Sequence, residues 1–361
     1  MIFYIFSIAV FAFILWQAML FWIALGHRPT GERLQRCKKS AQWGKYSFRN
    51  VLETPTMTSN KGFWHQLYKL FFVKVPDREP VAEVPHQKTN LNDIPRSKDV
   101  YVWLGHSSVY IQTAGKRFLF DPVLTCKLPV WWFMRPYKGA DCYSPSDIPE
   151  IDYLIITHDH WDHLDMLTVK ALKNRVRAVV CPLGVGAHFE YWGYDKDKIF
   201  DLDWNETFAA DNNVKLHCLP TRHFSGRFGL PKALWASFMI ESEKRNIFVS
   251  GDGGYDDRYK IIAKKFPNID LAIMENGQYD DGWKYIHTRP SELPTAVSNL
   301  NPKRVVTYHH SKFSLARHAW YEPIDMFYQN SQNKPWQLLT PMIGEPFFLD
   351  ENQTFSKWWK I

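Results

Sequence analysis

A run of histidines and aspartates at residues 157–165 constrains this chain more than any other part of its sequence. The run reads T-H-D-H-W-D-H-L-D and directly follows a short apolar segment, which predicts a buried strand. Its side chains should therefore gather at the carboxyl end of a strand, where α/β folds commonly bind ligands. Imidazole and carboxylate groups suit zinc and similar divalent metals. In this H-x-H-x-D-H spacing, His158 and His160 can bind one metal ion while Asp162 and His163 face a second.

Three more candidate ligands follow apolar segments later in the chain. His223, Asp252 and His309 each lie just beyond a predicted strand, and glycines flank Asp252. The predicted ligand set is His158, His160 and His223 for one metal, Asp162, His163 and His309 for the other, and Asp252 as a bridge between the two. A water shared by two metals would lose a proton near neutral pH and act as the nucleophile. Asp162 and Asp252 are therefore expected to be catalytic as well as metal-binding.

Other polar residues are weaker candidates for the same site. His287 can donate a proton to a leaving group or contact a phosphate, and we predict a catalytic role for it, with a purely structural histidine as the alternative. Arg222, Arg227 and Arg317 can pair with a phosphate, because guanidinium matches phosphate oxygens, or remain solvated at the surface. The residues expected to orient ligands or cap a helix are His106, Asp159 and Asp165.

The chain also contains a weak internal repeat. Residues 117–121 followed by 151–156 resemble residues 246–252 followed by 269–273. In each pair, a strand that ends at an acidic residue precedes a second, buried strand. Two such halves predict two sheets face to face, with helices outside and the metal site along one shared edge. Helices are expected over residues 166–174, 184–192, 258–266 and 291–300.

The first 25 residues predict a membrane anchor. Residues 2–25 are almost wholly apolar, and about 20 apolar residues suffice for a helix to cross a bilayer. A signal peptide would need a basic segment before the apolar run, and none is present. A buried core helix is the other alternative. Basic residues follow the run at positions 28, 33, 36, 38, 39 and 45, which places the rest of the chain on the cytoplasmic side. We therefore divide the chain into an anchor (1–26), a juxtamembrane connecting region (27–98) and a hydrolase domain (99–361).

Charge and cysteine content narrow the compartment and the partners. The net charge is +7, but the positive residues are concentrated beside the apolar run, so nucleic acid is not an expected partner. The five cysteines are scattered without a C-x-x-C pair, which favours reduced thiols and a cytosolic location. The aromatic segment at residues 63–72 predicts a helix that either packs on the domain or contacts the lipid interface.

Together, these segments resemble the metallo-β-lactamase superfamily, and within it the branch of N-acyl-phosphatidylethanolamine-hydrolysing phospholipase D. The resemblance covers residues 45–345 and is carried by residues 103–108, 120–122, 157–165, 251–255 and 309–323. It implies an αββα sandwich, two zinc ions held by the seven ligands named above, and hydrolysis of a phosphodiester in a lipid headgroup. Iron and manganese can also occupy such ligand sets. Glu275, Asn276 and His310 depart from the family pattern, so the substrate cannot be copied across.

These observations predict a single-pass membrane protein whose cytoplasmic dizinc hydrolase domain cleaves a phosphodiester, with a phospholipid as the expected substrate and the bilayer as a partner. A second possibility retains the metals but changes the substrate to a soluble lactone, sugar phosphate or cyclic nucleotide, because a fold does not fix a function. A non-catalytic, membrane-tethered scaffold that binds metal is the alternative of another class.

Overall fold

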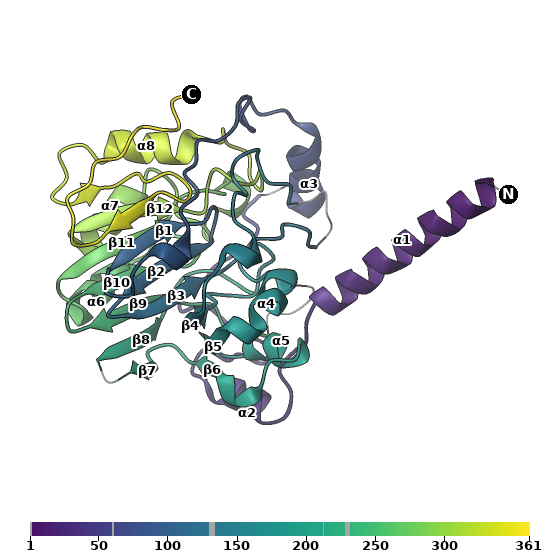
Figure 1. Ribbon diagram of the computed structural model, residues 1–361, viewed down its shortest axis with the longest axis horizontal. Coiled ribbons are helices and arrows are strands. Elements are labelled where there is room, and N and C mark those ends of the chain that lie inside the picture. The colour runs from purple at the N-terminus through teal and green to yellow at the C-terminus, as the bar shows by residue number, and fades with distance from the viewer. Residues whose placement is uncertain (1, 60, 130–133, 212, 228–231) are drawn as a thin grey trace.

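Two seven-stranded sheets lie face to face, with helices on both outer sides (Figure 1). This computed structural model describes residues 2–59, 61–129, 134–211, 213–227 and 232–361. In spatial order, the first sheet contains β14 (Pro346–Phe348), β1 (Val100–Trp103), β2 (Val109–Thr113), β3 (Lys116–Phe120), β4 (Ile151–Ile155), β5 (Val176–Pro182) and β6 (Ile199–Leu202). The second contains β13 (Gln337–Leu338), β12 (Arg304–Tyr308), β11 (Ile269–Glu275), β10 (Asn246–Val249), β9 (Ser237–Ser242), β8 (Val214–Leu219) and β7 (Thr207–Asp211).

Five helices cover the outer faces of the two sheets. They are α4 (Met166–Leu172) and α5 (Gly186–Tyr191) on the first sheet, and α6 (Arg258–Lys265), α7 (Leu293–Leu300) and α8 (Glu322–Asn330) on the second. The first four match the predicted helices to within two residues at each end. The αββα sandwich expected from the sequence is confirmed.

The internal repeat corresponds to equivalent strands of the two sheets. In the first half β3 pairs in parallel with β4, and in the second half β10 pairs in parallel with β11. Each sheet combines antiparallel pairs on one side with parallel pairs on the other. Because the paired strands are parallel, the acidic residues that follow them emerge at the same edge of the sandwich.

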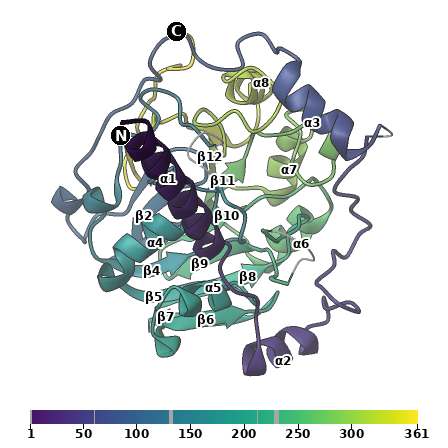
Figure 2. The ribbon, with the colours of Figure 1, turned by 90° about the vertical axis from the view of Figure 1, so that its right-hand side faces the viewer.

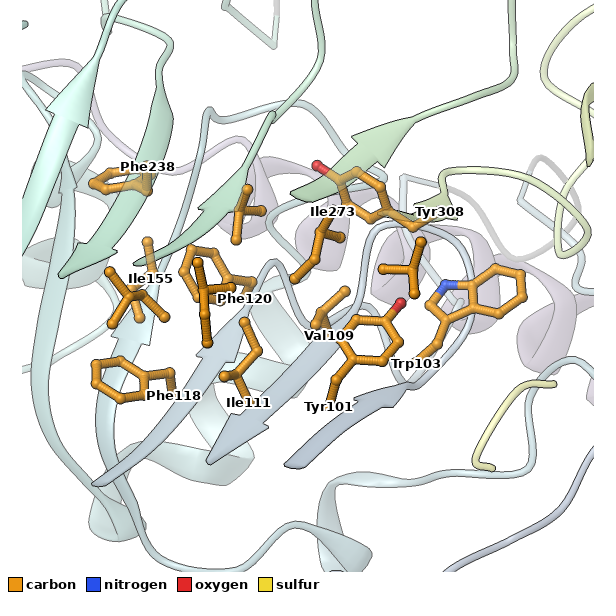
Figure 3. Close-up of a cluster of buried hydrophobic side chains, with 14 of the residues drawn as sticks. Tyr101, Trp103, Val109, Ile111, Phe118, Phe120, Ile155, Phe238, Ile273 and Tyr308 are labelled. Carbon is orange, nitrogen blue, oxygen red and sulfur yellow. The ribbon is translucent and has the colours of Figure 1, made fainter. Parts of the chain in front are cut away.

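The main core lies between the two sheets. Figure 3 shows Ile111, Phe118 and Phe120 of the first sheet facing Phe238 and Ile273 of the second, and all five side chains are fully buried. Successive residues of a strand point to opposite faces, so neighbouring side chains pack under the outer helices instead. The strands are therefore apolar on both faces over most of their length, and the candidate metal ligands lie in the loops that follow them.

In the described part of the chain, three α-helices precede the first strand. The first, α1 (Ile2–Ala24), projects away from the sandwich, and its segment from Tyr4 to Ala24 is long and apolar enough to cross a membrane (Figures 1 and 2). The second, α2 (Gly31–Lys39), and the third, α3 (Gly62–Phe72), lie in the predicted connecting region. The aromatic segment at 63–72 is thus a helix, although the side chains of residues 63, 70 and 71 lie outside the described part.

Candidate metal centre

The polar residues of the site come from loops at the carboxyl ends of five strands. Asp121 follows β3, the histidine-rich run follows β4, His223 follows β8, Asp252 follows β10 and His309 follows β12. These ends meet at one edge of the sandwich, where the structure brings all seven predicted ligands together. Ligand atoms of His158, His160 and His223 form one group, and those of Asp162, His163, Asp252 and His309 form another; within each group they lie within 4.8 Å of one another.

The first group consists of three imidazoles. The Nδ1 atom of His160 lies 2.9 Å from Nε2 of His158 and 3.2 Å from Nε2 of His223. His223 is held in this orientation because its Nδ1 lies 2.7 Å from the carbonyl oxygen of Ile286. Nitrogen ligands of a tetrahedral zinc ion, bound at about 2.0–2.1 Å, stand about 3.3 Å apart, so the spacing of these nitrogens suits such an ion.

The second group shares a carboxylate with the first. Nε2 of His163 lies 3.1 Å from Oδ2 of Asp252 and 3.1 Å from Nε2 of His309, which in turn lies 3.2 Å from Oδ2 of Asp162. The same Oδ2 of Asp252 lies 3.9 Å from Nε2 of His158, in the first group. Oδ2 of Asp252 therefore faces both donor groups, at the position for which the sequence predicts a bridge.

The ionisation of the cluster also suits a cation. Burial lowers the pKa of His158 and of His223 well below the usual value, so both imidazoles are neutral near neutral pH, which is the form that binds metal. Burial alone would also lower the pKa of His163, but the surrounding carboxylates, Asp252 foremost, outweigh it and raise that pKa well above the usual value. A proton on His163 thus balances buried negative charge that a metal ion would otherwise balance.

Buried atoms without hydrogen-bond partners are a further sign that the cluster can hold metal ions. Of the seven candidate ligands, all of which lie in the described part of the chain, Asp252 and His309 each have a buried atom without a hydrogen-bond partner, Oδ1 and Nδ1 respectively. An unpaired buried acceptor costs about 1–3 kcal/mol, and coordination to a cation would remove that cost for Asp252. The donor types, their spacing and this orphaned oxygen all fit a pair of divalent cations.

Several residues orient the candidate ligands. Asp121 is fully buried; it lies 2.8 Å from Nδ1 of His163 and accepts hydrogen bonds from the backbone and hydroxyl of Thr157. Nε2 of His106 lies 3.0 Å from Oδ2 of Asp162. Asp121, His106 and His309 all adopt positive φ angles, which non-glycine residues rarely do and which cluster at functional sites. Asp165 caps α4, as predicted, by accepting from the backbone of Leu167.

Sequence reasoning left two orienting carboxylates without a role, Asp121 and Glu275. Asp121 carried an available signal, because it directly follows β3 as Asp252 follows β10. Glu275 ends β11, and its Oε1 accepts a hydrogen bond from Nδ1 of His287. Its other oxygen accepts from the backbone of Thr288 at 3.2 Å. Glu275 thereby fixes the ring of His287 beside the cluster, with Nδ1 of that ring 3.9 Å from Asp252.

Two of the three candidate arginines, Arg227 and Arg222, contact the protein chain itself. Arg227 is buried, and its guanidinium donates to the backbone carbonyl oxygens of Ala24, Asp159 and Leu164. Arg222 donates to the hydroxyl of Thr54 and to a neighbouring carbonyl oxygen. The prediction for Arg227 was wrong because its three partners come from segments distant in sequence, which no local pattern reveals.

Comparison with known proteins gives the family. Residues 116–310 match the model of the beta-lactamase superfamily domain. An uncharacterized protein of Mycobacterium tuberculosis is 31% identical over 288 residues, which are 78% of this chain and 77% of that protein. The N-acyl-phosphatidylethanolamine-hydrolyzing phospholipase D 1 of Caenorhabditis elegans is 30% identical over 244 residues, 62% of this chain and 67% of that enzyme.

Solved structures share the fold. A metallo hydrolase from Ignicoccus hospitalis aligns with a TM-score of 0.53 at 16% identity, covering 69% of this chain and 97% of that chain. The diiron beta-hydroxylase CmlA from Streptomyces venezuelae aligns with a TM-score of 0.54 at 19% identity, and the match spans 69% of this chain but only 53% of CmlA. The chain therefore belongs to the metallo-β-lactamase superfamily and is a metal-dependent hydrolase related to the N-acyl-phosphatidylethanolamine-hydrolysing phospholipases D.

Proposed function

We propose that this protein hydrolyses a phosphodiester bond of a phospholipid, using two divalent metal ions, zinc in the first instance, in a domain that α1 anchors to the membrane. The observation that carries the proposal is the shared carboxylate of Asp252, whose Oδ2 lies 3.1 Å from His163 of one donor group and 3.9 Å from His158 of the other. When bound, two divalent ions would lower the pKa of water to supply a nucleophile and neutralise charge on the phosphoryl oxygens.

Residues of the protein would orient the metal ligands and donate a proton to the leaving group. Asp121 and His106 hold His163 and Asp162 in place, so that the ligands need not reorganise during the reaction. His287 directs Nδ1 toward Glu275, which leaves Nε2 at the opposite edge of the ring for a substrate oxygen. We assign to His287 the donation of a proton to the departing oxygen.

The positions of α1 and α3 support a lipid substrate, because both helices lie on the same side of the molecule. Figure 1 places both helices on the right-hand side of the sandwich, and Figure 2 views that side directly. Trp64, Tyr68 and Phe72 follow a four-residue spacing along α3 and are 78%, 56% and 73% exposed. Buried Gln66 lies against residue 282, so α3 rests on the loop that leads to His287. Aromatic residues in this position suit a membrane interface.

The basic residues that follow α1 favour a location of the domain on the cytoplasmic side of the membrane.

The lipid assignment is tested by comparing two kinds of substrate. Purified full-length protein in detergent is expected to hydrolyse N-acyl-phosphatidylethanolamine in mixed micelles with a higher kcat/KM than it shows toward soluble lactones, sugar phosphates or cyclic nucleotides. Product analysis would show release of phosphatidic acid. Hydrolysis of a soluble compound at equal or greater efficiency, with the phospholipid left intact, would contradict the lipid assignment.

The aromatic face of α3 gives a second prediction. Replacing Trp64, Tyr68 and Phe72 together by serine should lower turnover of phospholipid in vesicles by about tenfold, equivalent to about 1.4 kcal/mol of lost interfacial interaction. Turnover of a soluble nitrophenyl diester should stay unchanged. Ile261→Ser is the matched control, because Ile261 is also exposed, at 67%, but belongs to α6, which Figure 1 shows on the left of the sandwich, away from α3. An equal loss on both substrates would contradict the interfacial role.

Metal content provides a third prediction. The protein is expected to contain about two equivalents of divalent metal by elemental analysis, because the ligand atoms form two groups. Dialysis against a chelator should abolish hydrolysis, and adding zinc, iron or manganese back separately should identify the ions that restore it. A protein that remains fully active after its metal has been removed would contradict the proposed function.

A further inference from the structure

The end of α1 is built into the catalytic domain. The ring of Phe21 stacks on Trp161, in the middle of the histidine-rich run, with 6.0 Å between ring centroids and 20° between ring planes. The indole of Trp192 donates to the carbonyl oxygen of Ile23 at 2.8 Å. The last carbonyl groups of a helix lack partners within the helix, and here the domain supplies them. Ala24, at the end of α1, is fully buried.

Arg227 joins this helix end to the metal-binding run. One of its terminal nitrogens donates to the carbonyl oxygen of Ala24, and a positive charge there is favourable because a helix carries partial negative charge at its carboxyl end. Its Nε donates to the carbonyl oxygen of Asp159 at 2.7 Å, and its other terminal nitrogen to that of Leu164. The guanidinium lies 4.2 Å from the ring centre of Trp161. The two carbonyls bracket residues 160–163, which include three candidate ligands.

A second connection runs through His188. Its Nδ1 accepts a hydrogen bond from the backbone of His27 at 3.1 Å, and its Nε2 lies 3.2 Å from Oδ2 of Asp159. The other oxygen of Asp159 accepts from the backbone of Gly226 at 2.7 Å. Gly26 makes this approach feasible: its φ is +73°, and a Cβ at this position would lie 1.9 Å from Nδ1 of His188. A flexible tether would have no need of such a residue.

We propose that the last turn of α1 is a structural support of the metal-binding run, and that Arg227 is the positioning residue through which α1 holds residues 159–164 in place. The anchor would then do more than retain the enzyme at the membrane. The inference rests on the proposed metal centre, because it assigns to Arg227 an effect on the ligands of that centre.

The expected loss of metal affinity can be estimated from other metal sites, where residues that contact the ligands, but not the metal, also matter. Substitution of a residue that orients a ligand typically costs 10–100-fold in metal affinity. Arg227 contacts carbonyls on both sides of His160, Asp162 and His163, so its loss should affect both donor groups. Lysine retains the charge but cannot bind three carbonyls in one plane, because it lacks the planar fork of donors. The conservative Arg227→Lys exchange therefore tests geometry rather than charge.

The test uses full-length protein in detergent micelles, with Co²⁺ alone as the probe. After chelation, each variant is titrated with Co²⁺ against a competing chelator, and the visible absorption of bound Co²⁺ reports the coordination geometry. We expect Arg227→Lys to bind Co²⁺ at least about tenfold more weakly, with an altered spectrum, and Phe21→Ala to change both readouts in the same direction. Thermal unfolding of each metal-free variant is measured as well. A variant that still unfolds cooperatively has kept its fold, so its weaker binding of Co²⁺ then comes from the site.

Two matched controls sharpen the comparison. Arg175 also donates to two backbone carbonyl oxygens, those of Ile148 and Pro145, so Arg175→Lys removes the same kind of interaction elsewhere. Phe11 lies on α1 but is 63% exposed, so Phe11→Ala changes the anchor without changing the junction. Both controls should stay within twofold of the parent protein in Co²⁺ affinity, with an unchanged spectrum.

The outcomes are distinct from those of the proposed function. Parental affinity and spectrum in Arg227→Lys and Phe21→Ala would overturn the inference while leaving the metal centre intact, and so would equal losses in the two controls. If Arg227→Lys does not fold, Phe21→Ala decides alone. A parent protein that binds no Co²⁺ would overturn both the inference and the proposed function.

Discussion

Replacing Asp252 by alanine is expected to lower kcat/KM for any phosphodiester substrate by at least about 1,000-fold, or about 4 kcal/mol of transition-state stabilisation. The reason is its central position, since Oδ2 of Asp252 lies 3.1 Å from His163 and 3.8 Å from His223, in different donor groups. Losing this carboxylate removes a donor from both groups. Bound metal, measured by elemental analysis, should fall from about two equivalents to one or fewer.

The control for this substitution lies five residues away. Asp257 is exposed and pairs with Lys260 on the surface, so Asp257→Ala should leave activity and metal content unchanged. Asp162→Ala and His163→Ala should resemble Asp252→Ala in activity, and each variant should still unfold cooperatively. If Asp252→Ala retains two equivalents of metal and turns substrate over at the parental rate, the proposed site is wrong.

The candidate ligands could be predicted because their signals are local. Four of them lie within residues 158–163, and each of the other three lies within four residues of the end of a strand that the apolar pattern indicates. Parallel pairing of β3 with β4, and of β10 with β11, turns the carboxyl ends of these strands toward one edge of each sheet, and the packing of the two sheets brings the ligands together. The chemistry of the site is therefore encoded in short segments, and the fold brings them together.

The supporting residues could not be predicted in the same way. Glu275 contacts His287, and Arg227 contacts Ala24, but nothing near Glu275 or Arg227 in the sequence indicates these partners. Both contacts arise from tertiary packing between segments of different elements. A buried charged side chain needs a partner, so burial would have been the decisive signal, and burial is a property of the folded chain.

A histidine that donates a proton should be needed most when the departing group is a poor one. His287→Ala is expected to lower kcat for a phospholipid, whose leaving group is an alkoxide, by about 100- to 1,000-fold. The same variant should lower kcat for a nitrophenyl diester by less than about tenfold, because nitrophenolate departs without a proton. Glu275→Gln should show a smaller loss of the same kind, since it weakens the hydrogen bond that orients His287.

The dependence on the leaving group distinguishes this role from metal binding. Ligand atoms of Asp252, Glu275, His287 and His309 also lie within 4.8 Å of one another, so His287 could instead serve as a ligand. A ligand would be needed equally for both substrates, and its loss would reduce the metal content. A proton donor leaves the metal content near two equivalents and affects only the substrate with the poor leaving group. If His287→Ala loses metal and its kcat falls equally for the two substrates, His287 is a metal ligand and not a proton donor. Because Glu275 accepts a hydrogen bond from Nδ1, Nε2 is the nitrogen that would act in either role, and the comparison of the two substrates decides between them.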